Sequence, residues 1–192
     1  MSNSNSLLAI YNIIPSAIVV AYTDLHETKS LTHIVSYRSS IIETATLIKL
    51  SSLINGNYAI DGFAVDNIEN KYRFTVTYLI QSSISNTGFR LITKTTDILS
   101  IASLQGIFPA FNWAEREIWD LSGVFFTNHP DLRRILTDYG FSGHPLRKDF
   151  PVSGFREVRY TDTIKQISYN TVELSQALRL PLASPVWSNA QA

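Results

Sequence analysis

The chain has 192 residues, of which 45% are hydrophobic, and its 16 basic and 16 acidic side chains give a formal net charge of zero. This length and composition suit one core-forming domain and exclude a disordered chain. A zero net charge argues against a nucleic-acid-binding protein and against electrostatic docking on anionic lipid. The chain has no cysteine, so disulfides, thiolate-bound zinc and cysteine-bound iron–sulfur clusters are excluded.

The beginning of the chain carries no charged side chain through residue 23. Its apolar part, residues 7–22, is shorter than the roughly 20 residues of a membrane-spanning helix, and Asn12 and Pro15 interrupt it. No basic region precedes this part, as a signal peptide requires, and Arg38 is the first arginine, whereas transit peptides are rich in arginine. We therefore expect a chain with no membrane span and no removable targeting segment.

The N-terminal half of the chain contains the patterns of both helices and strands. Residues 6–14 predict a short helix ended by a proline, and residues 41–54 repeat apolar side chains at helical spacing up to Asn55-Gly56, a typical C-cap pair. Residues 72–80 alternate apolar and polar side chains, as in a half-buried antiparallel strand, and Ser85–Gly88 predicts a turn. Runs rich in β-branched and aromatic residues predict five strands in all, at residues 17–23, 31–37, 58–65, 72–80 and 89–95.

A further helix is expected from Asn112 to Leu121, with Gly123 ending it. Asn112 is the predicted N-cap, and Glu115, three residues on, is the predicted partner in a capping box. The order of elements is a helix, two strands, a helix and then three strands. It predicts an α+β fold in which helices cover one face of a mixed or antiparallel sheet.

The C-terminal part is expected to lack regular elements. Turn-forming residues recur every few positions beyond His129, at Pro130, Gly140, Gly143, Pro145, Pro151 and Gly154. The last segment has few charges, two prolines and Trp187, which suits an extended arm laid over a partner, with a frayed terminus as the alternative. We divide the chain into an α+β domain at residues 1–110, an interface segment at residues 111–162 and an extended tail at residues 163–192.

Charge is concentrated between Glu115 and Asp162, which we call the charged stretch. It holds eight acids and seven bases, nearly half of all formal charges in the chain, interleaved with aromatic side chains. Arginine and aromatic residues are enriched at protein interfaces, and arginine with aspartate suits bidentate, partly buried pairs. The stretch predicts an interaction surface or a tightly cross-braced substructure.

Two histidine–proline pairs within this stretch each precede a pair of basic residues. The pairs are His129-Pro130 before Arg133-Arg134 and His144-Pro145 before Arg147-Lys148. Such a set would suit an anion clamp. The balance of charge favours the alternative, in which the arginines pair with Asp131, Asp138 and Asp149 in the same stretch.

Catalytic and metal-binding motifs are weak. His129, His144, Glu115 and Glu117 are possible metal ligands, but they lack a known ligand spacing, and Glu115 and Glu117 would face different ways on a helix. Glu115, Asp120 and His129 would make an acid–base set, yet no nucleophile elbow, glycine-rich dinucleotide motif or P-loop accompanies them. His26 and His33 fall in the strand region and are expected to be ordinary surface or core residues.

The charged stretch with the residues just before it resembles the signature region of the C-subunit family of respiratory complex I. In mitochondria this family is called NADH dehydrogenase subunit 9 or iron–sulfur protein 3. The resemblance rests on motifs in one order and spacing, namely Glu115-Arg116-Glu117, Asp120, Gly123, the run from His129 to Leu136 and the run from Gly143 to Asp149. Ser122 departs from the family, which usually has an aromatic residue there, and this indicates a local packing change or a different neighbour.

The resemblance implies a non-catalytic, structural subunit in the peripheral arm of proton-pumping NADH:ubiquinone oxidoreductase. There it would belong to the quinone-reducing module and brace the forty-nine-kilodalton subunit, which we call the large quinone-module subunit. Other peripheral-arm subunits would be further partners. The complex uses FMN and iron–sulfur clusters to pass electrons from NADH to ubiquinone, but this chain is expected to bind no cofactor. Ten residues are expected to form or brace the interface: Glu115, Arg116, Glu117, Asp120, His129, Arg133, Arg134, His144, Arg147 and Lys148.

The alternative function is a stand-alone metal- or acid/base-dependent hydrolase that uses His129, His144 and Glu117. For the location, isoleucine clearly outnumbers valine, and asparagine and serine are abundant, which suits an A/T-rich organellar gene. We therefore expect a peripheral subunit on the matrix side of the mitochondrial inner membrane. The cytoplasmic face of a bacterial plasma membrane is the alternative location.

Overall fold

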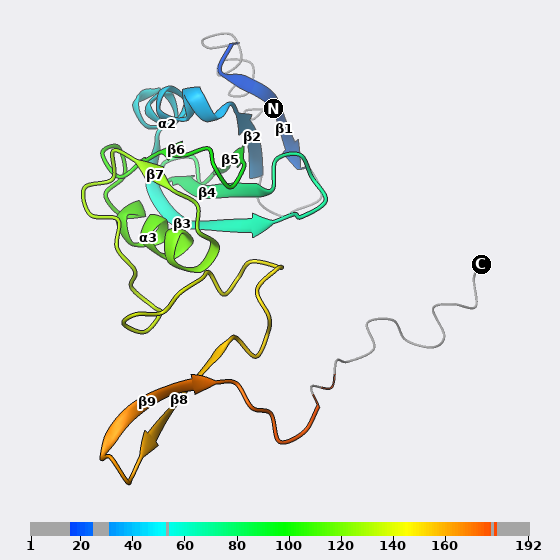
Figure 1. Cartoon of the computed structure of the whole chain (residues 1–192). Helices are drawn as coiled ribbons and strands as arrows, with labels where there is room; N and C mark the ends of the chain where they lie inside the picture. Colours follow the sequence, from blue (N-terminus) through cyan, green and yellow to red (C-terminus); the bar gives the residue numbers. More distant parts are fainter. Residues whose placement is uncertain (1–15, 25–30, 53, 178, 180–192) are drawn as a thin grey trace, which may run out of the picture. The chain divides into compact units, whose positions relative to one another are not determined.

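The computed structural model describes residues 16–24, 31–52, 54–177 and 179 (Figure 1). The chain divides into two compact units, Met1–Phe150 and Pro151–Ala192. The helix expected at residues 6–14, His26 and the end of the expected tail, with Trp187, lie outside the described residues. Within the described ranges, no helix has both the length and the apolar character needed to cross a bilayer.

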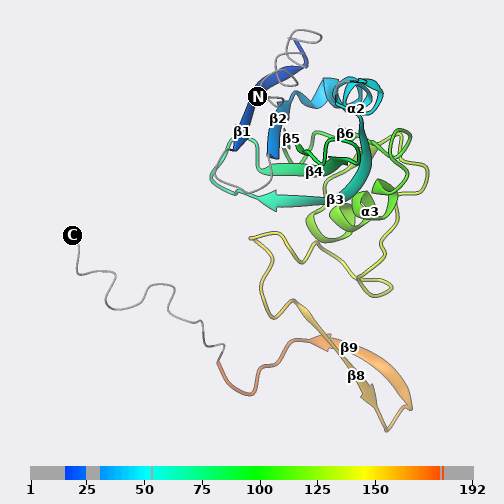
Figure 2. The ribbon, with the colours of Figure 1, turned by 180° about the vertical axis from the view of Figure 1, so that it is seen from behind.

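A five-stranded mixed sheet forms the centre of the first unit. Its strands are β1 (Ile18–Asp24), β2 (Leu31–Ser36), β3 (Gly56–Asp66), β4 (Phe74–Ser82) and β5 (Gly88–Thr95). They lie in the order β1-β2-β5-β4-β3, with β1 and β3 at the two edges (Figure 2). β2 and β5 pair in parallel and the other neighbours pair antiparallel, so the five predicted strands and the mixed sheet are confirmed.

The first helix of the described chain, α2 (Ile41–Leu50), follows a 3-10 turn, η1 (Arg38–Ser40), and packs against the start of β3. The contact is close because Gly56 has no side chain. A Cβ built at Gly56 would lie 2.6 Å from the Ile48 side chain of α2 and 3.2 Å from the Ile80 side chain of β4. α2 therefore covers the face of the sheet to which Ile80 points.

The next helix, α3 (Phe111–Ser122), covers the same face. A Cβ built at Gly62 on β3 would lie 3.2 Å from the Ala114 side chain of α3 and 3.4 Å from the Tyr78 ring of β4. Tyr78 and Ile80 are two residues apart on one strand and so point to the same side. The prediction that the helices cover one face of the sheet is confirmed for the described part of the chain.

Strand β4, which lies between β5 and the edge strand β3, supplies many of the side chains beneath the helices. Phe74, Val76, Tyr78 and Ile80 are fully buried, as the alternating pattern predicted. Burial of each such side chain contributes about 1.5–3 kcal/mol to folding. Helix α3 packs on this face of β4, where the Tyr78 ring contacts the Phe111 ring.

The end of α2 differs from the prediction. The helix ends at Leu50, because the backbone of Ser51 is extended, with ψ 122°. The Ser51 carbonyl then accepts the N–H groups of Ile54 and Asn55 at 3.2 and 2.8 Å, which closes a turn. Asn55 has a left-handed φ of 49°, so the Asn55-Gly56 pair forms the turn into β3 and does not cap the helix.

The predicted capping box at the start of α3 is wrong. The helix begins at Phe111, and its N-cap residue, Ala110, makes no side-chain hydrogen bond. Asn112 lies inside the first turn. Glu115 is fully buried and accepts the N–H of Leu104, a residue outside the helix, so its carboxylate is not available to the helix terminus.

The chain segments before and after α3 are held together by two short parallel strands, β6 (Ile101–Ala102) and β7 (Phe126–Thr127). The N–H of Ser103 donates to the Thr127 carbonyl at 2.9 Å and continues this pairing. The pairing fixes Ser103 and Leu104 beside the buried side of α3.

In the second unit the described chain forms an antiparallel hairpin, β8 (Arg156–Thr161) and β9 (Gln166–Thr171). Between residues 130 and 155 the chain makes only turns and bends, as expected, but the hairpin was not predicted. Lys165 in the connecting turn has a left-handed φ of 52°. The division at residues 110 and 162 stays a prediction.

The hairpin has one apolar and one polar face. Val158 pairs with Tyr169, and Tyr160 pairs with Ile167, so these four side chains share one face. Each of them is between 50% and 65% exposed. Glu157, Arg159 and Thr161 alternate with them on β8 and point to the polar face.

Candidate functional site

The charged stretch is anchored to the C-terminal end of α3. Gly123 has a left-handed φ of 76°, and its N–H donates to the carbonyls of Ile118 and Trp119, which ends the helix where the sequence predicted. A Cβ at this position would lie 2.6 Å from the His144 ring and would also collide with Arg147. Glycine is needed here both for its backbone conformation and for space.

The last turn of α3 leaves carbonyl groups without partners in the helix, and the segment near Arg147 supplies the donors. The Leu146 N–H donates to the Leu121 carbonyl at 2.9 Å. The Arg147 guanidinium donates to the Ser122 carbonyl at 2.7 Å and to the Gly123 carbonyl at 3.3 Å. Its positive charge therefore lies at the negative end of the helix dipole.

Asp120 is the second anchor and is fully buried. One carboxylate oxygen accepts the consecutive backbone N–H groups of Ile135, Leu136 and Thr137 at 2.8–3.1 Å. The other accepts the Thr137 hydroxyl at 2.6 Å and an Arg134 N–H at 3.0 Å. Burial alone would raise the pKa of Asp120, but these hydrogen bonds outweigh it and hold the pKa well below its usual range.

His144 also contacts the C-terminal end of α3. Its Nδ1 lies 3.0 Å from the Asp120 carbonyl oxygen, and its ring lies 5.4 Å from the Trp119 ring, measured between centroids. Burial lowers the pKa of His144, and the nearby charges of Arg147 and Arg134 act in the same direction. Of the two neutral tautomers, the one with its proton on Nδ1 donates to this carbonyl.

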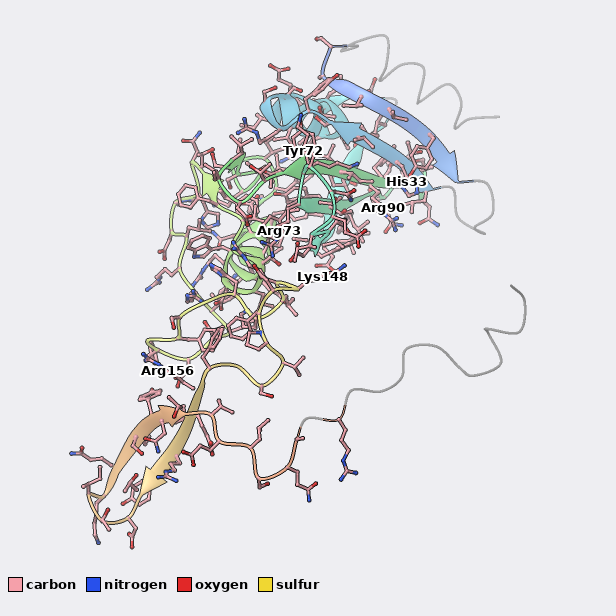
Figure 3. All side chains as sticks on the ribbon, turned by 45° about the vertical axis from the view of Figure 1, so that its right-hand side comes forward. His33, Tyr72, Arg73, Arg90, Lys148 and Arg156 are labelled. Carbon is pink, nitrogen blue, oxygen red and sulfur yellow. The ribbon has the colours of Figure 1, made fainter. Side chains whose placement is uncertain are left out.

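A second cluster of charges has Arg73 at its centre, just before β4 (Figure 3). The Arg73 guanidinium donates to both carboxylate oxygens of Asp66 at 2.8 Å and lies 2.9 Å from Asp149 and 3.4 Å from Asp97. The hydrogen bond from Arg73 lowers the pKa of Asp66. Asp66 also accepts the backbone N–H of Lys148 at 2.9 Å, so this cluster ties the charged stretch to the β3–β4 hairpin.

Arg147 connects the C-terminal end of α3 with the charge cluster around Arg73, and we call these two places the anchoring regions. Its guanidinium lies 3.4 Å from Asp97, which also contacts Arg73. The cationic carbons of Arg73 and Arg147 lie 5.1 and 5.2 Å from the centroid of the Phe74 ring. The stretch is therefore cross-braced to the sheet as well as to α3.

Glu115 and His129 form a closed polar cluster beneath α3, and both side chains are fully buried. The Glu115 carboxylate accepts the Leu104 N–H at 2.8 Å, the Tyr78 hydroxyl at 3.3 Å and the Ser103 hydroxyl. The Nε2 atom of His129 lies 3.9 Å from it. Burial raises the pKa of Glu115, since the hydrogen bonds only partly offset the cost of a buried charge.

Four of the ten predicted residues lie outside these buried clusters. The Arg133 side chain is 71% exposed and pairs with Asp131 at 2.8 Å. The Arg116 guanidinium lies 5.0 Å from the Trp113 ring centroid and donates to the Arg133 carbonyl at 3.2 Å. Glu117 and Lys148 are exposed.

The comparisons with known proteins decide the family. Residues 34–156 match the family model described as "Respiratory-chain NADH dehydrogenase, 30 Kd subunit". The chain belongs to this family. The match contains α3, both anchoring regions and the buried Glu115 cluster, so the resemblance seen in the sequence is confirmed.

Relatives among the NADH dehydrogenases match most of the chain. The protein of Caulobacter vibrioides, the C subunit of its NADH-quinone oxidoreductase, is 42% identical over 158 residues, covering 82% of this chain and 80% of that protein. NADH dehydrogenase [ubiquinone] iron-sulfur protein 3 of Marchantia polymorpha is 41% identical over 186 residues, covering 96% and 93%. The same-named protein of Oryza sativa is 50% identical over 127 residues, covering 66% and 67%.

A solved structure shares the fold. A chain from the membrane-bound sulfane sulfur reductase, an archaeal respiratory membrane complex, aligns with a TM-score of 0.66 and 20% sequence identity. The alignment covers 79% of this chain and 86% of that chain. At this identity the likeness concerns the fold.

The hydrolase alternative is not supported in this member of the NADH dehydrogenase family. His129 is buried beside Glu115, His144 is bonded to the end of α3, and Glu117 is exposed, and no contact joins the three. Within the described ranges, no group of three or more histidine and acidic side chains is placed to hold a metal. The expected pairing within the stretch holds for Asp131 with Arg133, whereas Asp149 pairs with Arg73.

Several residues of the site were missed by the sequence analysis. Asp66 and Arg73 had a detectable signal, because they carry opposite charges on the two sides of the turn between two predicted strands. Asp97, Ser103 and Tyr78 had none. Their roles depend on contacts between segments that are far apart in the chain.

Proposed function

We propose that this chain is a structural subunit, without a catalytic centre or redox cofactor of its own, in the peripheral arm of proton-pumping NADH:ubiquinone oxidoreductase. There it braces the large quinone-module subunit, within the part of the arm that reduces quinone. FMN and the iron–sulfur clusters then belong to neighbouring subunits. The proposed location is the matrix side of the mitochondrial inner membrane, or the cytoplasmic face of the plasma membrane if the chain is bacterial.

The observation that carries the bracing role is the apolar face of the β8–β9 hairpin. A two-stranded hairpin is at best marginally stable in water unless its apolar face packs on something else. Here Val158, Tyr160, Ile167 and Tyr169 lie on one face and are at least half exposed. A second protein surface is the natural cover, and tyrosine is among the residue types enriched at interface centres.

The contacts made by the charged stretch support a structural rather than a catalytic role. Asp120, Arg134, His144 and Arg147 use their polar groups to bind backbone or side chains of the same unit. Glu115 is sealed in the core. The chain also has no cysteine with which to ligate an iron–sulfur cluster.

The test is site-specific photocrosslinking within the assembled complex. A benzophenone amino acid replaces Tyr160 on the apolar face in one preparation, and Glu157 on the polar face of the same strand in the matched control. We expect the crosslink from position 160 to reach the large quinone-module subunit with a yield several-fold above that from position 157. No crosslink from position 160, or a crosslink to a different subunit, would contradict the bracing role.

A further inference from the structure

A groove of about 330 Å³ lies between β3 and α3 on the first unit. Its apolar lining includes Ala59, Phe111, Ala114 and Ile135. The groove opens where the pairing of β3 with β4 is irregular, between Ala59 and Asp61, so that Ile60 between them has no partner on β4. No side chain of the described residues fills it.

Two acidic side chains line this groove from opposite elements, Asp61 on β3 and Glu117 on α3. Both are exposed, and neither forms an ion pair with any described residue. Asp61 accepts the N–H of the adjacent Gly62. Arg116, the base next to Glu117 in the chain, is already directed to the Arg133 carbonyl and the Trp113 ring.

Two large apolar side chains complete the lining. Ile60 is 58% exposed and Trp113 is 65% exposed, although both lie beside an apolar floor. Tryptophan is enriched at interfaces, and strongly so among the residues that dominate binding energy. The groove therefore combines an apolar floor, an aromatic rim and uncompensated negative charge.

We propose that this groove receives a segment of a neighbouring subunit that presents an arginine or lysine next to an apolar side chain. The apolar side chain packs on Ala59 and Ala114, and the cation is placed between Asp61 and Glu117. Arginine suits the site better than lysine, since its planar group both stacks on indole and bonds carboxylates. The inference rests on the proposed function, because it assumes that the chain is held in the complex.

The experiment uses the purified complex with a benzophenone amino acid in place of Ile60. The matched control carries the same amino acid in place of Ile84, which is 78% exposed on the β4–β5 turn and lies outside the groove lining. We expect mass spectrometry to map the position-60 crosslink to another subunit, within a few residues of an arginine or lysine. No equivalent crosslink is expected from position 84.

A charge variant then tests the acids. Glu117→Lys in the position-60 background is expected to lower the crosslink yield about tenfold, since like charges then face each other across the interface. Glu117→Gln is expected to fall between this variant and the parent. Glu69→Lys, which makes the same charge change on the exposed β3–β4 turn, is the control and should leave the yield unchanged.

The outcomes separate this inference from the proposed function. A chain that is present in the complex but gives no crosslink from position 60, or one far from any basic residue, overturns the groove assignment alone. Equal yields for Glu117→Lys and Glu69→Lys overturn it as well. Absence of the unmodified chain from the complex overturns the proposed function.

Discussion

At the scale of single residues, Asp120 holds residues 134–137 of the charged stretch beside α3. Its carboxylate collects three consecutive backbone N–H groups and two side-chain donors from residues 134–137, and it does so while fully buried. A buried carboxylate with this many donors is held in its ionised form. Residues 134–137 are therefore held next to α3.

Asp120→Asn tests this role. The amide has a single acceptor oxygen, so either the backbone donors or Arg134 and Thr137 lose their partner, and we expect the free energy of unfolding at pH 7 to fall by about 3 kcal/mol. The folded-state pKa of Asp120 is lowered, so its stabilisation is complete above the ordinary value near 3.8 and is lost as the pH falls through the folded-state pKa. Urea unfolding should show a constant difference in the free energy of unfolding between wild type and variant from pH 7 down to about pH 3.8, and a smaller difference at about pH 3. Asp131→Asn, at an exposed ion pair, is the control and should change stability by less than about 0.5 kcal/mol.

Glu115 should show the opposite dependence on pH. Its folded-state pKa is raised, so the folded chain binds more protons than the unfolded chain above pH 4.5, and wild-type stability falls as the pH rises through this range. Glu115→Gln keeps an acceptor for the Leu104 N–H and removes the titration. We expect the free energy of unfolding of the variant, relative to wild type, to rise with pH from about pH 4.5 upward. A difference that stays constant with pH would show that Glu115 does not titrate differently in the folded chain.

At the scale of elements, the C-terminal end of α3 organises the candidate site. Gly123 ends the helix, and the guanidinium of Arg147 bonds two of the carbonyls that the helix leaves free. Arg147 also reaches Asp97 and the face of Phe74, so one side chain joins the helix end to the sheet. The neighbouring Arg133, in contrast, has only an exposed partner.

This contrast gives a paired prediction. Arg147→Ala should lower the free energy of unfolding by about 1.5–3 kcal/mol, because it removes charge-assisted hydrogen bonds from partly buried carbonyls. Arg133→Ala should change it by less than about 0.5 kcal/mol, since surface ion pairs contribute little. Both variants should lower the amount of assembled complex more than the turnover per assembled complex, measured by quantitative blotting and NADH oxidation. Normal assembly with reduced turnover would count against a structural role.

The elements were predictable where one face of a local segment is buried. Along β4, apolar residues alternate with other residues because one face of the strand is buried. The β-branched runs of the other strands were a similarly local signal. Strand β8 also alternates, at Val158 and Tyr160, but turn-forming residues recur just before it, and this composition led to the prediction of short turns without regular elements. The predicted capping box failed because Glu115 bonds to Ser103 and Leu104, a contact set by the β6–β7 pairing that no local pattern reveals.

At the scale of the whole molecule, the chain combines a well-buried first unit with a second unit whose described part has little core of its own. The sequence motifs were sufficient to predict the family. The motifs were not sufficient to tell which charged residues bind within the first unit and which are exposed. That distinction depends on partners such as Asp66, Arg73 and Asp97, which lie outside the charged stretch. Most of the charged motif residues bind groups within the first unit, and we propose that the apolar hairpin and the acidic groove contact neighbouring subunits.

The measurement that tests the central claim most directly is a native gel of gently solubilised membranes, probed for this chain and stained for NADH oxidation. A second, denaturing dimension identifies the subunits that migrate with it. The structural role predicts that the chain co-migrates with a very large NADH-oxidising band that also contains the large quinone-module subunit. Migration of the chain as a small species, apart from that activity, would contradict the account.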